Sequence, residues 1–220
     1  MSLSGEEPKT PMSLSGEEPS GTRTRAAIAI AAVLTFSGVL VGALWSWLAP
    51  PANGVVALTR AGERVHAYVG SQSEHLFIGP FLLIGFVMVV GAVAAVAAWQ
   101  WRAHRGPLLL VALVAGNVGC AATAAGVGAL LAHLRYGSVD LAGAPVTPEH
   151  RVHYVTEAAP VFFGQSGWQV ALTLLSGAAV AALVYALAAV SNARDDLGAW
   201  PPVDPVPMPL RVDGVLPTVP

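Results

Sequence analysis

Histidines are the residues of this sequence best suited to chemistry, and five of the six lie on one predicted face of the membrane, the outer one, or at its edge. His150 and His153 are three residues apart, with Glu149 and Glu157 nearby. Imidazole and carboxylate groups are ligands that zinc and copper accept. One hypothesis is therefore an outward-facing metal site built from some of His66, His75, His133, His150 and His153.

The spacing of the closest pair argues against that hypothesis. The residues around His153 alternate in polarity as a β-strand does. Successive strand residues point to opposite faces of a sheet, so His150 and His153 would point apart. We therefore predict ordinary solvated or hydrogen-bonded histidines, no metal site and no cofactor.

Other catalytic motifs are missing from the sequence. It has no glycine-rich phosphate loop, no nucleophile elbow and no paired-histidine zinc helix. Cys120 is the only cysteine, which leaves no disulfide framework and no CxxC pair. The apolar segments hold no Asp, Glu, Lys or Arg, whereas ion and proton pathways usually need such groups inside the bilayer. We predict that the protein is not an enzyme, and the pattern argues against an active transporter or proton pump.

Composition places the chain among membrane proteins. It is 55% hydrophobic and 11% charged, with a mean hydropathy of +0.62, whereas a soluble domain has about 25% charged residues. The formal net charge of -2 and the lack of any Lys/Arg run argue against a nucleic-acid partner. The lipid bilayer is the partner that the composition indicates.

Four apolar stretches are each long enough to cross a membrane. A hydrocarbon core about 30 Å thick needs roughly 20 helical residues. We predict an all-α membrane protein, a four-transmembrane-helix bundle whose domain covers residues 26–190, with Trp45 and Trp47 at a membrane interface. The first stretch is longer than the apolar region of a signal peptide and three more follow, so we expect it to remain as an anchor. The predicted spans are residues 26–48, 76–101, 107–134 and 168–190.

Small residues predict how these helices pack, because helices in lipid associate through close approach and interhelical hydrogen bonds. The third span is richest in them and is expected at the centre of the bundle. Asn117 is expected to tie two helices together, with a ligand contact as the alternative. Gly38 and Gly42 form a GxxxG pattern that suits intramolecular packing or, alternatively, a homodimer. The predicted packing positions are Gly38, Gly42, Gly116, Asn117, Gly119 and Gly126, and Gly91 is expected to tolerate a larger side chain better than Gly119 or Gly126.

The arginines near the spans predict the orientation. The connection between the second and third spans is very short and carries Arg102 and Arg105, whereas three of the four opposing arginines lie inside longer loops. We therefore predict a multi-pass protein of the cell (plasma) membrane with cytoplasmic N- and C-termini. The two compared sets are Arg23, Arg25, Arg102, Arg105 and Arg194 against Arg60, Arg64, Arg135 and Arg151.

The two extracytoplasmic loops are small and show strand patterns. In the first loop, an apolar run at residues 55–59 and an alternating run at 64–69 flank Gly62. That arrangement is compatible with a β-hairpin in which Gly62 supplies the turn. Residues 151–155 of the second loop would add a further strand to a small outer cap.

Both ends of the chain are predicted to be disordered and cytoplasmic. Residues 1–25 contain the octapeptide MSLSGEEP twice, so that Met1 and Met12 are both plausible starts. Their polar composition cannot form a core. Residues 191–220 form a proline-rich tail, for which the alternative is a polyproline-type partner site.

Four strings carry a family resemblance: LWSWLAPP at residues 44–51, WQWRAHRGP at 99–107, RVHYVTE at 151–157 and RDDLGAW at 194–200. With them the chain resembles a family of mycobacterial and related actinobacterial integral membrane proteins of unknown function. The resemblance covers about residues 23–200 and leaves the duplicated N-terminus outside it. It implies a host group and a membrane location, and it brings no activity, cofactor or site residue.

Two functions follow from these observations. The first is a structural or accessory subunit of a cell-envelope or respiratory membrane complex, with membrane-protein partners bound through the small-residue helix faces. The alternative is an extracytoplasmic sensor or binding protein for a metal or small molecule.

Overall fold

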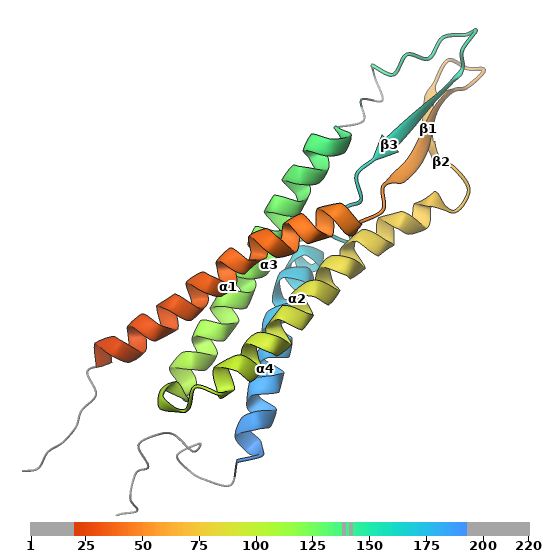
Figure 1. Cartoon of the computed structure of the whole chain (residues 1–220). Coiled ribbons are helices and arrows are strands. Elements are labelled where there is room, and N and C mark those ends of the chain that lie inside the picture. Colours follow the sequence, from red (N-terminus) through yellow and green to blue (C-terminus); the bar gives the residue numbers. More distant parts are fainter. Residues whose placement is uncertain (1–19, 138–139, 141–142, 193–220) are drawn as a thin grey trace, which may run out of the picture.

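A computed structural model describes residues 20–137, 140 and 143–192 of the chain. In this part four long helices run side by side and a small sheet stands at one end (Figure 1). The predicted N-terminal segment lies outside the described residues up to position 19, and so does the tail after 192. Residues 20–25 were expected to be disordered but are helical. The first helix begins at Ser20 and includes the two arginines that precede the apolar run. The helices are α1 (Ser20–Leu48), α2 (His75–Trp99), α3 (Pro107–Tyr136) and α4 (Gly167–Val190), with short 3-10 turns η1 (Gln72–Glu74) and η2 (Arg102–His104).

All four helices are long and apolar enough to cross a membrane, judged by length and composition. Their ends carry ordinary start signals. Pro107 occupies the first turn of α3, where its missing N–H costs no hydrogen bond. Ser166 and Gln169 form a capping box at the start of α4. The predicted four apolar helices are therefore present in the structure.

Two helix pairs build the bundle. α1 packs most extensively on α3, and α2 packs on α4, while α3 also contacts α4 (Figure 1). The predicted neighbours α2 and α3 run antiparallel through the short η2 connection. The chain thus passes along the bundle four times, and the start of α1 and the end of α4 both lie at the end opposite the sheet (Figure 1).

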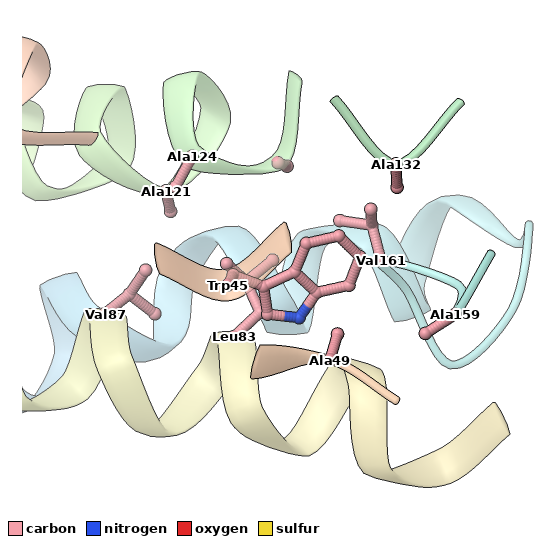
Figure 2. Close-up of a cluster of buried hydrophobic side chains, with 10 residues drawn as sticks. Trp45, Ala49, Leu83, Val87, Ala121, Ala124, Ala132, Ala159 and Val161 are labelled. Atoms are coloured by element: carbon pink, nitrogen blue, oxygen red, sulfur yellow. The ribbon is translucent and has the colours of Figure 1, made fainter. Parts of the chain in front are cut away.

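Trp45 forms the centre of the core near the sheet (Figure 2). Its side chain is completely buried, and its indole Nε1 donates a hydrogen bond of 2.7 Å to the carbonyl oxygen of Gly79. Trp45 therefore packs inside the protein and does not face outward from the bundle. The neighbouring Trp47 is 74% exposed on the outside of α1. The indole fits because α3 has Gly128 opposite it, where an added Cβ would lie 2.7 Å from the indole Cε3.

The sheet confirms the predicted hairpin and its additional strand. β1 (Ala52–Leu58) lies between β2 (Arg64–Tyr68) and β3 (Val152–Glu157), and both pairings are antiparallel. Gly62 takes a positive φ of 83° in the β1–β2 turn, a conformation that glycine adopts without steric cost. The fold is consequently mostly helical with one three-stranded sheet.

The two faces of this sheet differ. Val56 of β1 is completely buried on one face, where Ala144 and Val146 cover it. On the other face the residues of β2 and β3 are exposed, while Val55 and Ala57 of the central strand β1 are partly buried. One face therefore belongs to a small core of its own, and the other is open.

Candidate functional site

A polar cluster of three side chains lies on the covered face of the sheet, beside the helix bundle. His66 and Tyr68 come from β2, and Glu157 ends β3. The His66 Nε2 atom lies 2.7 Å from Glu157 Oε1, and the Tyr68 hydroxyl donates a hydrogen bond of 3.1 Å to Glu157 Oε2. The two rings of β2 meet edge to face with centroids 4.9 Å apart. The Glu157 carboxylate of β3 therefore contacts both His66 and Tyr68 of β2.

Gly54 explains how this contact crosses the central strand. Tyr68 pairs with Gly54 in the register, and Glu157 pairs with Ala52, so β1 separates the two partners of the ion pair. A Cβ at Gly54 would lie 2.6 Å from His66 Nε2. The missing side chain therefore leaves the space in which the imidazole reaches Glu157.

Burial and a neighbouring charge change the pKa of one member of this cluster, Tyr68. Burial raises the pKa of the Tyr68 hydroxyl, and the negative charge of Glu157 and the hydrogen bond to it raise that pKa further. Tyr68 consequently remains a neutral donor at physiological pH. The His66–Glu157 contact has the distance of an ion pair, but its geometry does not meet the requirements of a hydrogen bond. Its strength therefore depends on protonation of the imidazole.

A cavity of about 520 Å³ opens beside this cluster, where the sheet meets α2 and the segment before α4. Its volume falls in the range of small-ligand pockets, about 300–1,000 Å³. The ring of Phe163 packs edge to face on Phe81 of α2, 4.7 Å between centroids. Aromatic and apolar groups with one carboxylate and one phenol form the walls. The lining residues are Tyr68, Leu76, Phe77, Glu157, Ala158, Pro160, Val161, Phe162, Phe163, Gly164 and Gln165.

The remaining histidines of the metal hypothesis do not join the cluster. His75 Nδ1 lies 2.8 Å from the carbonyl oxygen of Pro51. His150 precedes β3 and belongs to a turn with Thr147. The alternation of side chains along a strand therefore does not apply to the pair His150 and His153, because only His153 lies in the strand. Within residues 20–137, 140 and 143–192, no three His, Cys, Asp or Glu side chains gather as a set of metal ligands. The alternative set that included His133 therefore has no geometric support there.

Four of the predicted packing glycines lie where α1 meets α3. A Cβ at Gly38 or Gly42 would collide with α3 backbone, at Cys120 and Ala124 respectively. A Cβ at Gly116 would lie 2.9 Å from the Ala31 Cα atom, and one at Gly119 would meet the hydroxyl of Thr35. These residues let the two backbones approach closely.

The prediction for Gly126 is wrong, and so is the one for Gly91. A Cβ at Gly126 would meet no atom within 4 Å, because this residue points away from the neighbouring helices. Gly91 of α2, expected to be tolerant, lies against the carbonyl of Gly177 in α4. The sequence signal for that contact is the small-residue pair Ser176 and Gly177 on α4.

Asn117 does not tie two helices together as predicted. Its side-chain nitrogen donates a hydrogen bond of 2.8 Å to the carbonyl oxygen of Leu113, one turn earlier in the same helix. The residue is buried, and its Oδ1 atom has no hydrogen-bond partner among the described residues. This hydrogen bond within α3 gives the side-chain amide nitrogen of Asn117 a partner without a second helix.

The fold defines a class: a bundle of four membrane-type helices with a three-stranded sheet at one end. A family model described as "Protein of unknown function (DUF2567)" matches residues 34–199. The chain belongs to this family, and the resemblance to a mycobacterial family of unknown function is confirmed.

Curated relatives share most of their length with the chain. The uncharacterized protein Rv1591 of Mycobacterium tuberculosis (strain H37Rv) is 54% identical over 173 residues, which cover 78% of this chain and 90% of the relative. The uncharacterized protein ML1222 of Mycobacterium leprae is 48% identical over 176 residues, covering 80% and 89%. No solved structure matches the chain.

Proposed function

We propose that the protein spans the cell membrane four times and acts as a structural or accessory subunit of a cell-envelope or respiratory membrane complex. The observation that carries the membrane location is the apolar outside of the bundle. Phe36, Val93 and Leu183 are each more than half exposed, and they lie within three different helices, at least six residues from either helix end. Exposed apolar surface of this extent is rare in soluble proteins, and lipid would cover it.

The charge distribution supports cytoplasmic termini. The described end opposite the sheet holds Arg23, Arg25, Arg102 and Arg105 and no acidic side chain. All five described acidic residues lie in the loops and strands at the other end. The short η2 connection holds two of the arginines, and such connections usually stay in the cytoplasm. The sheet then faces outward.

An exposed apolar patch on the open face of the sheet supports the accessory role. Two rows of paired residues cross the three strands there: Ala67, Val55 and Tyr154, then Val65, Ala57 and Val152. Tyr154 is 74% exposed, Val152 51% and Val65 45%. We call these six residues the sheet patch.

A protein surface is the occupant that this position favours. The next row toward the helices contains Asn53 and Thr156, which hydrogen-bond to each other, and Gln72 lies beside Asn53. This polar row separates the sheet patch from the apolar outside of the helices. Lipid that covers the helices would therefore not extend over the patch, whereas the apolar surface of a partner protein matches it.

Copurification from native membranes in mild detergent tests the proposal. The wild-type chain should elute in a complex much larger than its own 22.5 kDa. The double variant Tyr154→Ser/Val152→Ser should elute alone, because it removes the two most exposed members of the patch. The matched control Thr59→Ala lies in the hairpin outside the patch and should keep the complex. A wild-type chain that elutes alone would contradict the accessory role.

The cavity beside Tyr68 and Glu157 supports a second candidate, an extracytoplasmic receptor for a small amphipathic molecule. Its aromatic walls suit an apolar body, and the carboxylate at its edge suits a hydrogen-bond donor or a cation. Mass spectrometry of the protein purified under native conditions should then detect one bound molecule that Glu157→Gln loses. Recovery of a partner complex with an empty cavity would favour the accessory role instead.

A further inference from the structure

The end of the bundle opposite the sheet has a cavity of about 260 Å³ between the start of α1 and the η2–α3 turn. Its polar lining is basic: Arg23 comes from α1, and His104 and Arg105 come from the turn. No acidic side chain lines it. A cavity of this composition attracts an anion.

The start of α3 adds backbone donors to the same cavity. Residues 106–109 line it, and they form the cap and first turn of a 30-residue helix. Pro107 has no N–H and the Gly106 N–H is bonded to Tyr185, so the donors that this turn can offer are the amides of Leu108 and Leu109. The first amide groups of a helix have no partner within the helix and carry its positive dipole end. Tyr185 of α4 fixes this turn, because its hydroxyl accepts a hydrogen bond of 3.0 Å from the Gly106 nitrogen. The helix start is therefore held in place beside the cationic side chains.

Two side chains of the turn are also positioned. The Arg105 Nε atom donates a hydrogen bond of 2.9 Å to the carbonyl oxygen of Trp99, and the guanidinium lies 4.3 Å from the Trp99 ring centroid. His104 Nδ1 is buried and has no hydrogen-bond partner within the described part of the chain. A buried polar atom without a partner is costly. His104 lines the cavity through the other atoms of its side chain, because Nδ1 itself is shielded.

A second hollow, about 340 Å³ and almost wholly apolar, lies between α1 and α2 next to this cavity along the helices. On α1 the lining passes from Ala27 of the basic cavity to Ile30 of the apolar hollow, and on α3 it passes from Leu109 to Leu113. These steps of three and four residues are one helical turn, about 5 Å, on both helices. The basic cavity and the apolar groove therefore lie about one helical turn apart along α1 and α3.

We propose that these two hollows together bind one anionic phospholipid, with its phosphate in the basic cavity and an acyl chain in the apolar groove. The inference uses the proposed membrane location and does not depend on the accessory role. Basic pockets between membrane helices on the cytoplasmic side bind phospholipid headgroups in this manner. Inorganic phosphate has no acyl chain and would occupy only the basic cavity. The apolar groove therefore favours a phospholipid over free phosphate as the ligand.

Native mass spectrometry of the full-length protein, exchanged into micelles that contain phosphatidylglycerol or phosphatidylcholine, tests the proposal. One phosphatidylglycerol should stay bound per chain at collision energies that remove phosphatidylcholine. Arg23→Gln should reduce this occupancy about fivefold, as expected for one arginine near an anionic lipid, while Arg23→Lys should retain most of it. Arg25→Gln is the matched control, because Arg25 is exposed on the same helix turn and does not line the cavity.

The apolar groove has its own pair of variants. Ala97→Phe places a ring in the groove and should lower phosphatidylglycerol retention, whereas Val93→Phe alters an exposed residue of α2 outside the groove and should not. Equal retention of the two lipids, or equal losses with Arg23→Gln and Arg25→Gln, would overturn the proposal. So would thermal stabilisation by inorganic phosphate that equals the effect of phosphatidylglycerol. The measurement uses the isolated protein, so the absence of a partner subunit would not alter its outcome.

Discussion

Trp45 of α1 and Gly79 of α2 are joined by a hydrogen bond of 2.7 Å from the indole nitrogen to the carbonyl oxygen, inside the largest hydrophobic cluster. α1 and α2 otherwise touch little. This bond therefore fixes the first helix to the second at the point where the chain leaves the bundle for the sheet.

Replacing Trp45 by Phe should destabilise the protein by about 1–2 kcal/mol or more, because it removes a buried hydrogen bond and part of a well-packed ring. The melting temperature in a fixed detergent, followed by circular dichroism, gives the measurement. Trp47→Phe is the control, since Trp47 is exposed. Equal melting temperatures for the two variants would show that Trp45 does not hold the two helices together.

Gly91→Leu should destabilise the bundle far more than Gly85→Leu. A side chain at Gly91 meets the backbone of Gly177, which cannot move aside without separating α2 from α4, whereas Gly85 of the same helix has nothing within 4 Å. Overpacking of this kind costs roughly 1–3 kcal/mol or more. Folded yield by size-exclusion chromatography measures the difference. A similar loss at both positions would mean that α2 and α4 do not approach closely at Gly91.

The same comparison applies to α3, where Gly119→Leu meets Thr35 of α1 and Gly126→Leu points outward. We expect a clear loss of folded yield for Gly119→Leu and near wild-type yield for Gly126→Leu. A bundle that is more sensitive at Gly126 would contradict the observed orientation of α3.

An ordinary tyrosine has a pKa near 10. Tyr68 should ionise at a higher pH, because burial and Glu157 both raise its pKa. The folded state then holds the phenolic proton more tightly than the unfolded state. The resulting stabilisation is complete below pH about 10 and is lost as the pH rises through the higher folded pKa. Ultraviolet difference titration of the wild type against Tyr68→Phe isolates this group.

Glu157→Gln provides the check on the cause. It removes the negative charge but not the burial, so the Tyr68 pKa should fall part of the way toward the ordinary value. An unchanged titration in Glu157→Gln would show that the carboxylate does not act on Tyr68.

The sequence predicts the helices and the hairpin because those signals are local. Four uncharged apolar runs mark the spans, and Gly62 between two strand-like runs marks the turn. Which side of each helix faces its neighbours is different. Every side of these helices is apolar, so the pattern carries no direction, and Gly91 and Gly126 were assigned to the wrong environments for that reason.

The candidate site could not be predicted, because it depends on pairing between distant segments. His66 meets Glu157 only because β1 pairs with both β2 and β3, and because Gly54 lies between them. The burial of Trp45 depends on tertiary structure in the same way. A tryptophan at the end of an apolar run is typical of a membrane interface, and only the tertiary structure reveals that Gly128 opens a space for it.

The central claim is a four-span membrane protein with its sheet outside and its basic end in the cytoplasm. Single cysteines in a Cys120→Ser background test it in intact cells with a membrane-impermeant maleimide. Ser71 and Gln100 are the positions to substitute, because both are exposed and they lie at opposite ends of α2. We predict that Ser71→Cys is labelled in intact cells and that Gln100→Cys is labelled only after the membrane is opened. Labelling of Gln100→Cys but not Ser71→Cys would contradict the orientation, and labelling of both in intact cells would contradict the membrane-spanning fold itself.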